Sequence, residues 1–242
     1  MKILITGASS GIGKELSRLY ATAENDLILL ARREDRLRKL KLELCEAKSV
    51  EIVVADVSEF DTLQEKMRDI GAVDMVILNA GISLGHSLDL TPFKDFKKLY
   101  DVNLLSNHAI LEILLPHFKY RGSGKIVFIS SLASLFSMPS SKAYSSSKRA
   151  LNAYAEGIRY KYEPHGIKVI NILPGFIKSE LTDKNNFHMP FLLSTGDGAK
   201  IIKRAIDKNK KFYAFPKRFY FFILLFRLFP DSIKQKIIKS AL

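Results

Sequence analysis

The segment TGASSGIG, residues 6–13, places three glycines directly after the short apolar run KILIT at 2–6. A strand that ends in a glycine-rich turn and opens a helix, here GKELSRLYATA, forms a site for phosphate groups. Backbone N–H groups at the helix start carry partial positive charge, and glycine has no Cβ to keep a pyrophosphate away. The spacing of Gly7, Gly11 and Gly13 differs from the common G-x-G-x-x-G fingerprint, so the turn alone could also be a tight strand-to-helix connection.

Short apolar runs alternate with longer amphipathic stretches along most of the chain, which is typical of βαβ units around a parallel sheet. The further runs lie at 26–31, 50–55, 73–79, 125–130, 168–173 and, more weakly, 211–215. Because these runs are hydrophobic almost throughout, helices should cover both faces of the sheet. We therefore expect a single α/β domain, Rossmann-like and doubly wound, with seven mostly parallel strands. Its cofactor-binding catalytic part should span 1–216, with 217–242 as a basic, apolar helical extension of the same domain.

Helix ends can be predicted at two places. Thr91 is expected to cap a long helix that has Pro92 in its first position and runs through residue 118. A loop or short lid at 185–198 should lead into a helix capped by Ser194 or Thr195.

The end of the second apolar run indicates which dinucleotide the glycine turn would serve. It reads Leu30-Ala31-Arg32-Arg33, with no carboxylate where a ribose 2′-OH would be bound. Guanidinium groups suit a 2′-phosphate instead, so the pattern predicts NADP(H) in preference to NAD. The alternative is that Arg32 and Arg33 are only solvated charges at a helix start, where the helix dipole slightly disfavours them.

Tyr144 and Lys148 in AYSSSKRAL are one helical turn apart and should project from the same face. An ammonium beside a phenol favours the phenolate, so we expect a lowered pKa for Tyr144, which would suit it to proton transfer. An exposed tyrosine and lysine on a helix would show the same spacing. Ser130 and Ser131 follow a predicted strand, at the sheet edge where open α/β folds bind ligands, so one serine could hydrogen-bond a substrate carbonyl.

Taken together, these motifs resemble those of the classical short-chain dehydrogenase/reductase family from Lys2 to about residue 215. The family's T-G-x-x-x-G-x-G motif is met at 6–13, its Asp-Val at 56–57 and its N-A-G at 79–81. The resemblance implies catalytic roles for Asn103, Ser131, Tyr144 and Lys148. It also implies a cofactor site built from Gly7, Ser9, Ser10, Gly11, Ile12, Gly13, Arg32, Arg33, Asp56, Val57, Asn79, Ala80, Gly81, Tyr144, Lys148, Pro174, Gly175, Ile177 and Ser179.

Three positions depart from the family pattern. Leu78 stands where the family often has asparagine, Ser134 where glycine commonly follows the catalytic serine, and Ser179 where threonine is usual. The first two remove no catalytic group, but we expect them to alter strand packing or loop geometry beside the site. Asp56 and Asn79 could also serve only as turn residues at strand ends.

By this resemblance, NADPH would deliver hydride to a carbonyl carbon while Tyr144 protonates the oxygen, with the reverse for an alcohol. Ser131 would orient and polarise that oxygen, Lys148 would hold the nicotinamide ribose, and Asn103 would interrupt helical hydrogen bonding to position a water. The expectation is thus an NADP(H)-dependent carbonyl reductase that needs no metal. A catalytically quiet NADP-binding protein is the alternative.

Positive charge is concentrated near the carboxyl terminus. Of a net charge of +13, most comes from Lys200 onwards, where twelve Lys or Arg face Asp207 and Asp231. Without a recognition motif, nucleic-acid binding is not expected. The stretch 217–230 has eight consecutive apolar residues, far below the roughly 20 that span a bilayer. We expect burial in a subunit interface or over the substrate cleft, ahead of monotopic contact with an anionic membrane.

The remaining expectations concern location and substrate. A single cysteine, Cys45, and no cleavable apolar leader favour the cytoplasm over secretion, with peripheral contact at the inner face of a membrane as an option. The family implies a homodimer or homotetramer acting on a small molecule. Residues 180–193 should line the substrate entrance, where Phe187, Met189, Phe191 and Leu192 weakly indicate an apolar or lipid-like ligand.

Overall fold

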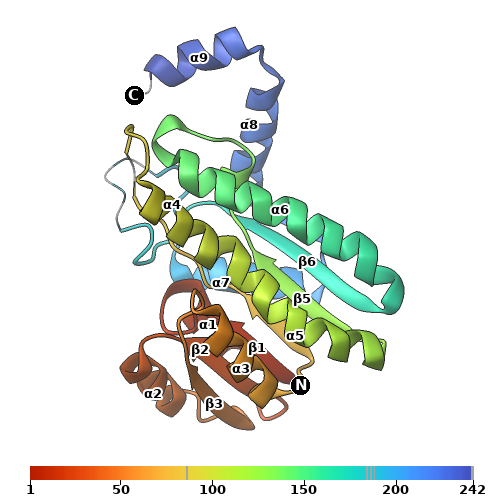
Figure 1. Cartoon of the computed structure of the whole chain (residues 1–242). Coiled ribbons are helices and arrows are strands. Elements are labelled where there is room, and N and C mark those ends of the chain that lie inside the picture. The colour runs from red at the N-terminus through yellow and green to blue at the C-terminus, as the bar shows by residue number, and fades with distance from the viewer. Residues whose placement is uncertain (86, 184, 186, 188, 241–242) are drawn as a thin grey trace.

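Seven parallel strands form one sheet in the computed structural model, which describes residues 1–85, 87–183, 185, 187 and 189–240. The strands lie in the spatial order β3-β2-β1-β4-β5-β6-β7, and each neighbouring pair is parallel (Figure 1). Their bounds are β1 Lys2–Thr6, β2 Asp26–Ala31, β3 Ser49–Val54, β4 Met75–Leu78, β5 Gly124–Ile129, β6 Ile167–Pro174 and β7 Phe212–Phe215. This arrangement confirms the predicted Rossmann-like, doubly wound α/β domain, with a sheet that is wholly rather than mostly parallel.

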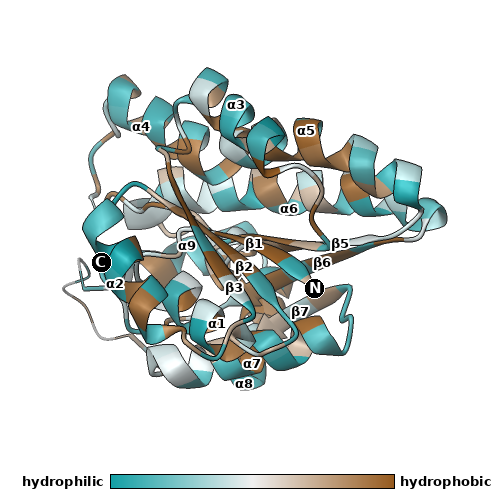
Figure 2. Ribbon diagram, turned by 90° about the horizontal axis from the view of Figure 1, so that it is seen from below, coloured by the Kyte–Doolittle hydropathy of each residue, from teal (hydrophilic) through white to brown (hydrophobic). Residues whose placement is uncertain are grey.

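Helices cover both faces of the sheet (Figure 2). Their bounds are α1 Gly11–Tyr20, α2 Glu34–Glu43, α3 Phe60–Ile70, α4 Phe93–Tyr100, α5 Ser106–Arg121, α6 Lys142–Tyr162, α7 Thr195–Asp207, α8 Lys217–Leu228 and α9 Asp231–Ser240. Strand β1 shows how the two layers arise, because successive side chains point to opposite faces. Ile3 and Ile5 pack with α1, α2 and α7, whereas Leu4 packs with α3, α5 and α6.

A π-helical segment, Asp101–Leu105, joins α4 to α5, so the long predicted helix is present but not regular throughout. Its start is one residue later than predicted. Pro92 is extended and acts as the cap, since its carbonyl accepts hydrogen bonds from the N–H groups of Asp95 and Phe96. Thr91 is therefore not the cap. Ser194 caps α7, because its Oγ accepts a hydrogen bond from the Asp197 N–H. This confirms the first of the two predicted caps, Ser194 or Thr195.

The chain order of the strands reverses at β1. After β3 the chain crosses to the other side of β1 and forms β4, so the loops that follow β1 and β4 diverge to opposite faces. Ligands of open α/β sheets bind at such switch points, outside the carboxyl ends of the strands. Asn79 and Ser130 come directly after β4 and β5 at this same edge.

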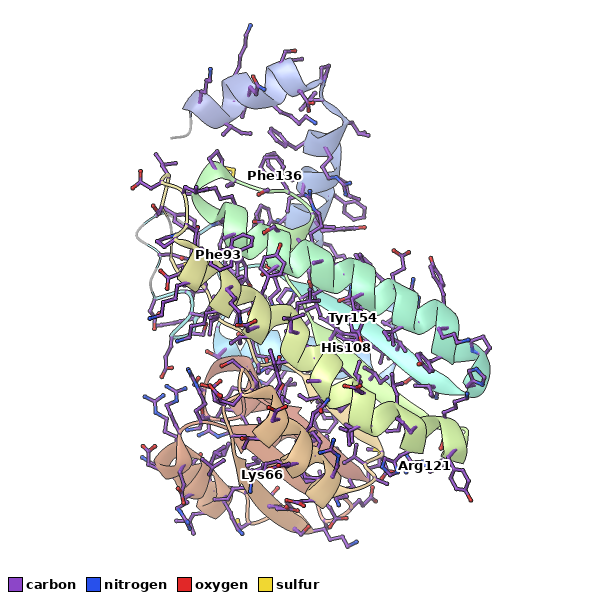
Figure 3. All side chains as sticks on the ribbon, viewed as in Figure 1. Lys66, Phe93, His108, Arg121, Phe136 and Tyr154 are labelled. Carbon is purple, nitrogen blue, oxygen red and sulfur yellow. The ribbon has the colours of Figure 1, made fainter. Side chains whose placement is uncertain are left out.

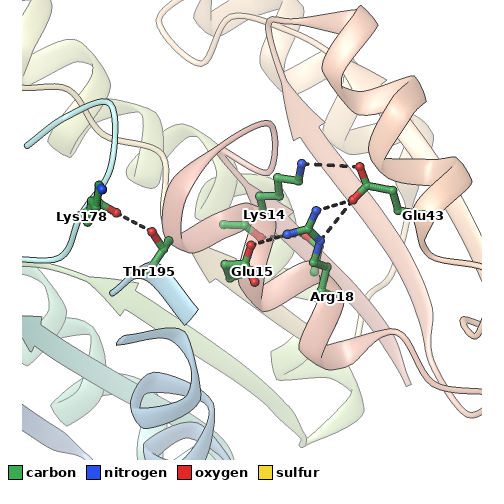
Figure 4. Close-up of polar contacts among 8 residues, drawn as sticks. Lys14, Glu15, Arg18, Glu43, Lys178 and Thr195 are labelled. Carbon is green, nitrogen blue, oxygen red and sulfur yellow. Dashed lines mark hydrogen bonds and ion pairs between the residues drawn. The ribbon is translucent and has the colours of Figure 1, made fainter. Parts of the chain in front are cut away.

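Ion pairs join the first two helices to each other. Arg18 of α1 lies between Glu15 and Glu43, 2.5 Å from each carboxylate, and Lys14 approaches Glu43 at 3.6 Å (Figure 4). On the neighbouring side, Thr195 Oγ1 donates to the carbonyl oxygen of Lys178 at 2.5 Å. That bond ties the loop after β6 to the start of α7.

The last two helices, α8 and α9, follow the edge strand β7 and extend away from the sheet (Figure 1). Helix α8 packs beside β7 through Ile223, which joins a small cluster with Leu132, Leu173 and Ala214. No side chain of α9 is buried. Within the described part of the chain, every helix is too short or too polar to cross a bilayer.

Candidate active site

The glycine turn is shaped by close contacts that exclude any side chain. Gly7 has a φ of +68°, and a Cβ there would lie 2.9 Å from Asn79 Nδ2. A Cβ on Gly13 would lie only 2.4 Å from the Gly7 carbonyl oxygen, while Gly11 needs glycine for its φ of +53°. The turn therefore brings the start of α1 directly against the end of β1, leaving the first N–H groups of α1 at the sheet edge.

Polar contacts join the ends of β1 and β4. Thr6 Oγ1 accepts hydrogen bonds from the N–H groups of Asn79 and Ala80, both at 3.0 Å. In return, Asn79 Nδ2 donates to the Thr6 carbonyl at 2.9 Å. Asn79 thus fixes the loop after β4 against the loop after β1. It therefore does more than form a turn at a strand end.

A cavity of about 220 Å³ opens above these strand ends. Of the cofactor residues predicted from the sequence, all but Gly13 line it, together with Ser131: Gly7, Ser9, Ser10, Gly11, Ile12, Arg32, Arg33, Asp56, Val57, Asn79, Ala80, Gly81, Tyr144, Lys148, Pro174, Gly175, Ile177 and Ser179. Gly13 lies beneath the turn and contributes by its packing against Gly7.

Arg33 occupies the rim of this cavity. Its guanidinium donates to Ser10 Oγ at 2.7 Å and to Ser9 Oγ at 3.1 and 3.2 Å. It also pairs with Glu180 at 2.7 Å, and Arg36 binds the other oxygen of the same carboxylate. These hydrogen bonds from Arg36 and Arg33 hold the pKa of Glu180 at about 2.

Arg32 lies nearby and pairs with Asp56 at 3.2 Å. Burial opposes ionisation of Asp56, but hydrogen bonds from Ser58 and Arg32 outweigh it and lower the pKa of that carboxyl. The side chain of Arg32 is 55% exposed against 38% for Arg33. Two guanidinium groups that follow the end of β2 therefore border the cavity, and Arg33 is the more firmly held.

Tyr144 and Lys148 project from one face of α6 into the cavity. Burial raises the pKa of Tyr144 to about 12, and a hydrogen bond with Ser131 opposes the rise. Burial lowers the pKa of Lys148 to about 8, and its ammonium donates to the Ile129 carbonyl at 3.0 Å. The predicted lowering of the Tyr144 pKa by Lys148 is therefore wrong for this structure, because loss of solvation outweighs it and Lys148 bonds elsewhere.

Asn103 lies inside the π-helical segment, and its side chain is wholly buried. Its Oδ1 accepts from the Ile82 N–H at 2.9 Å, while its Nδ2 donates to the Ile82 carbonyl and to Ser147 Oγ. Asn107 Nδ2 donates to the main-chain carbonyl of Asn103 at 2.9 Å. The change in helical hydrogen bonding thus coincides with Asn103, which connects the loop after β4 to α6.

Ser134 has a structural role beside Ser131. Its Oγ donates to the Ser131 carbonyl at 2.5 Å and accepts from Asn152 Nδ2 at 2.5 Å. Asn152 in turn accepts from Asn171 Nδ2 on β6 at 2.9 Å. The serine that replaces the family's usual glycine therefore ties the loop of Ser131 to α6, whereas Leu78 is simply buried in the core.

A second cavity of about 320 Å³ adjoins the first. Tyr144 lines both. The other walls come from α4, from the loop that precedes it and from the residues around the start of α6, including Leu84, Leu90, Pro92, Leu99, Ser141 and Lys142. Lys142 Nζ holds that loop by donating to the carbonyls of Ser87 and Leu88.

Some lining residues were not predicted from the sequence. Ile82 and Val102 carry no motif that would have identified them, and Glu180, Leu181 and Thr182 were predicted only to border the substrate entrance. Within that entrance range, positions 184, 186 and 188 lie outside the described residues. Among the residues that are described, no group of three or more His, Cys, Asp or Glu could hold a metal ion.

Comparison with known proteins places this geometry in a family. A family profile described as short chain dehydrogenase matches residues 1–189. An uncharacterized oxidoreductase of Mycobacterium tuberculosis is 37% identical over 216 residues, which cover 86% of this chain and 85% of that protein.

Two solved structures share the fold. A short-chain dehydrogenase from Sphingobium yanoikuyae in complex with NADPH has a TM-score of 0.84 at 23% identity, covering 98% of this chain and 95% of the other. An alcohol dehydrogenase from the archaeon Thermococcus sibiricus, complexed with 5-hydroxy-NADP, has a TM-score of 0.78 at 25% identity, covering 88% and 94%. With the family profile matching most of its length, the chain belongs to the short-chain dehydrogenase family of oxidoreductases, whose members bind a nicotinamide cofactor.

Proposed function

We propose that this protein is an NADP(H)-dependent oxidoreductase that interconverts a carbonyl and an alcohol and works mainly as a reductase. The observation that carries the proposal is the position of Tyr144, which lines both adjoining cavities. A phenol at that boundary can exchange a proton with a substrate in the second cavity while the dinucleotide occupies the first.

The residues of the first cavity fit a dinucleotide. The packing of Gly7 and Gly13 keeps the turn free of side chains, so a pyrophosphate can approach the N–H groups that begin α1. Ser9 and Ser10 would border the same group, and Asp56 and Val57 would lie beside the adenine. When bound, NADP(H) supplies or accepts the hydride at the substrate carbon.

In the direction of reduction, Tyr144 gives the proton on its Oη to the carbonyl oxygen. A pKa of about 12 keeps this phenol protonated at neutral pH, which is the state an acid needs. Ser131 is hydrogen-bonded to Tyr144, and its Oγ already accepts from the Ala133 N–H. Its hydroxyl proton can therefore point at the same carbonyl oxygen and polarise it.

Lys148 and Asn103 would help to replace the proton that Tyr144 gives up. A Cβ built on Gly81 would lie 3.3 Å from Asn103 Oδ1 and 3.4 Å from Lys148 Nζ, so both groups converge beside Gly81. With one hydrogen on the Ile129 carbonyl, the ammonium of Lys148 retains two for a ribose hydroxyl and for a water near Asn103. We assign these two residues to a proton path from solvent to Tyr144.

The choice of NADP(H) over NAD(H) is supported by Arg33 and Arg32. Both guanidiniums border the cavity where the adenosine ribose of a dinucleotide at this switch point would lie. A 2′-phosphate accepts charge-assisted hydrogen bonds from such groups. Complexes of the two similar structures, with NADPH and with 5-hydroxy-NADP, support the same choice.

The second cavity favours an apolar carbonyl compound. Leu84, Leu90, Pro92 and Leu99 contribute apolar walls, beside charged ones from Asp89, Asp95 and Lys142. Beyond Pro174 and Gly175, aromatic rings form a cluster in which Phe219 lies 6.0 Å from both Phe176 and Phe191, measured between ring centroids. These surfaces support a lipid-like substrate as the more specific form of the proposal.

A screen of ketones and aldehydes, followed by the loss of NADPH absorbance, tests the proposed function. We expect turnover with a subset of apolar carbonyl compounds, and turnover slower by about a hundredfold or more with the Tyr144→Phe variant. If NADPH binds but no compound in a broad panel is reduced, the protein is instead a catalytically quiet NADP-binding protein.

We further propose a cytoplasmic homodimer or homotetramer. The long helices α5 and α6 offer exposed aromatic side chains such as Tyr120 and Tyr160 for the contact between subunits. Light scattering on the purified protein measures the number of subunits directly.

A further inference from the structure

The outer face of α8 carries large apolar side chains that the rest of the chain leaves uncovered. Phe221, Phe222, Leu225 and Leu228 are between 58% and 80% exposed. Positions 221, 225 and 228 follow the spacing of one helical stripe, and 222 borders it. Such a contiguous apolar surface on a water-soluble domain marks a site of interaction with something else.

The inner face of the same helix is firmly packed, so the orientation of the exposed stripe is determined. Ile223 and Phe226 are buried, and the ring of Phe226 meets Phe136 edge to face at 4.8 Å. Figure 3 shows Phe136 on the loop that faces α8. The expected burial of the phenylalanines therefore holds for one side of the helix only.

Helix α9 continues this surface. It has no buried residue, and Ile233 and Ile237, one turn apart, are each more than 40% exposed. A helix that buries none of its side chains and still carries apolar ones at helical spacing needs a partner for them.

The charge around these helices indicates which partner. Residues 217–240 contain six Lys or Arg against one acidic residue, Asp231. Within the described chain, only Lys234 of the six forms an ion pair, with Asp231 at 2.7 Å. Arg218, Arg227, Lys236 and Lys239 remain available for an external anion.

We propose that α8 and α9 dock the protein on an anionic lipid bilayer, lying in its interface with the exposed apolar side chains inserted and the basic side chains at the headgroups. A helix of 12 residues is about 18 Å long, which suits lying in the interface and not crossing it. A second copy of this chain fits less well. In a two-fold interface the same basic surface would meet itself, and the like charges would repel.

Co-sedimentation with vesicles tests this proposal on the full-length protein. Vesicles with roughly one third phosphatidylglycerol in phosphatidylcholine should bind the wild type, and pure phosphatidylcholine should bind it far more weakly. Reversing two charges, Lys236→Glu with Lys239→Glu, should weaken binding by about thirtyfold or more, since each basic residue at an anionic surface contributes about fivefold. Phe221→Ser with Leu225→Ser should weaken it by at least about tenfold.

Matched controls separate docking from general charge or folding effects. Lys66→Glu with Lys161→Glu gives the same net charge on exposed positions of α3 and α6, and Leu42→Ser removes an exposed apolar side chain from α2. Figure 3 shows that Lys66 lies on the part of the molecule remote from α8. These controls should bind within about twofold of the wild type, and all variants should melt at similar temperatures because the changed residues are exposed.

Three results would overturn the proposal. The wild type could fail to sediment with anionic vesicles, or the control variants could lose binding as much as the variants in α8 and α9. Alternatively, light scattering could show a dimer that Phe221→Ser with Leu225→Ser dissociates while vesicles bind nothing. That last outcome would assign the surface to a second copy of the chain.

Discussion

The glycine turn after β1 and the outer face of α8 differ in how closely the rest of the chain packs against them. At the turn, a single methyl group added to Gly13 would lie 2.4 Å from the Gly7 carbonyl oxygen. On α8, the rings of Phe221 and Phe222 are each more than 60% exposed to solvent. The first region is complete within the chain, whereas the second needs an external partner. Substitutions should therefore affect folding and catalysis at the first region and association at the second.

The largest effect is expected at the boundary between the two cavities. Tyr144→Phe removes the proposed proton donor and leaves the ring in place, so turnover should fall by about 10²–10⁴-fold, the usual contribution of a general acid. NADPH affinity, measured by fluorescence titration, should change little. Turnover close to wild type would exclude Tyr144 as the acid.

A stability measurement tests how tightly the glycine turn is packed. Gly13→Ala should lower the free energy of unfolding by up to about 3 kcal/mol, because its Cβ meets backbone that cannot move aside easily. Gly157→Ala in α6 is the matched control, since nothing lies within 4 Å of its added Cβ and alanine favours a helix. Urea unfolding should show the control to be equal to or more stable than the wild type. Equal losses for both variants would contradict the close packing.

The preference for NADPH over NADH tests whether Arg33 and Arg32 bind the 2′-phosphate of the cofactor. Arg33→Ala should weaken NADPH binding by about 10–100-fold, the contribution expected of charge-assisted hydrogen bonds to a phosphate, and should hardly change NADH binding. Arg32→Ala should have the smaller effect, because that side chain is more exposed and pairs with Asp56. Isothermal titration with both cofactors measures this. Parallel losses for NADPH and NADH would mean that neither arginine recognises the 2′-phosphate.

The smallest effect is expected at Glu180, which would compete with the 2′-phosphate of the proposed cofactor for Arg33. Glu180→Gln should tighten NADPH binding a few-fold while costing no more than about 1 kcal/mol of stability, because the side chain is half exposed. Since pairing lowers the pKa of Glu180 to about 2, its contribution is present above the ordinary carboxyl pKa and is lost as the pH falls towards 2. Unfolding curves of wild type and variant should therefore converge between about pH 5 and pH 2. A difference that persists at pH 2 would show that the ion pair is not its source.

Local patterns predicted most of the fold. The strand bounds of β1 and β2 were predicted to the residue, because continuous apolar runs bounded by turn residues need no distant information. The helix start at Phe93 was missed by one residue, since the backbone of Pro92 is extended and only its carbonyl enters the helix. The motif residues at strand ends come to one edge because all the strands are parallel.

Contacts between distant residues could not be predicted in this way. Arg33 and Glu180 are 147 residues apart in sequence, and only the packing of the loop after β6 brings them together. The pKa of Tyr144 was expected to be lowered by Lys148, a neighbour in sequence, but burial among other segments raises it. Solvation depends on everything that surrounds a group, and a linear pattern does not contain that information.

By itself, the amino-acid sequence determined the order of strands and helices, the glycine turn at the end of β1 and the residues proposed for hydride-transfer chemistry. The first two follow from local periodicity and backbone freedom, whereas the third came from the resemblance of several motifs to one family. Only the tertiary structure decided that Tyr144 borders two cavities, that Glu180 forms an ion pair with Arg33, and which side of α8 is left exposed. Each of these depends on which surfaces meet when the chain packs, and that is a property of the whole fold.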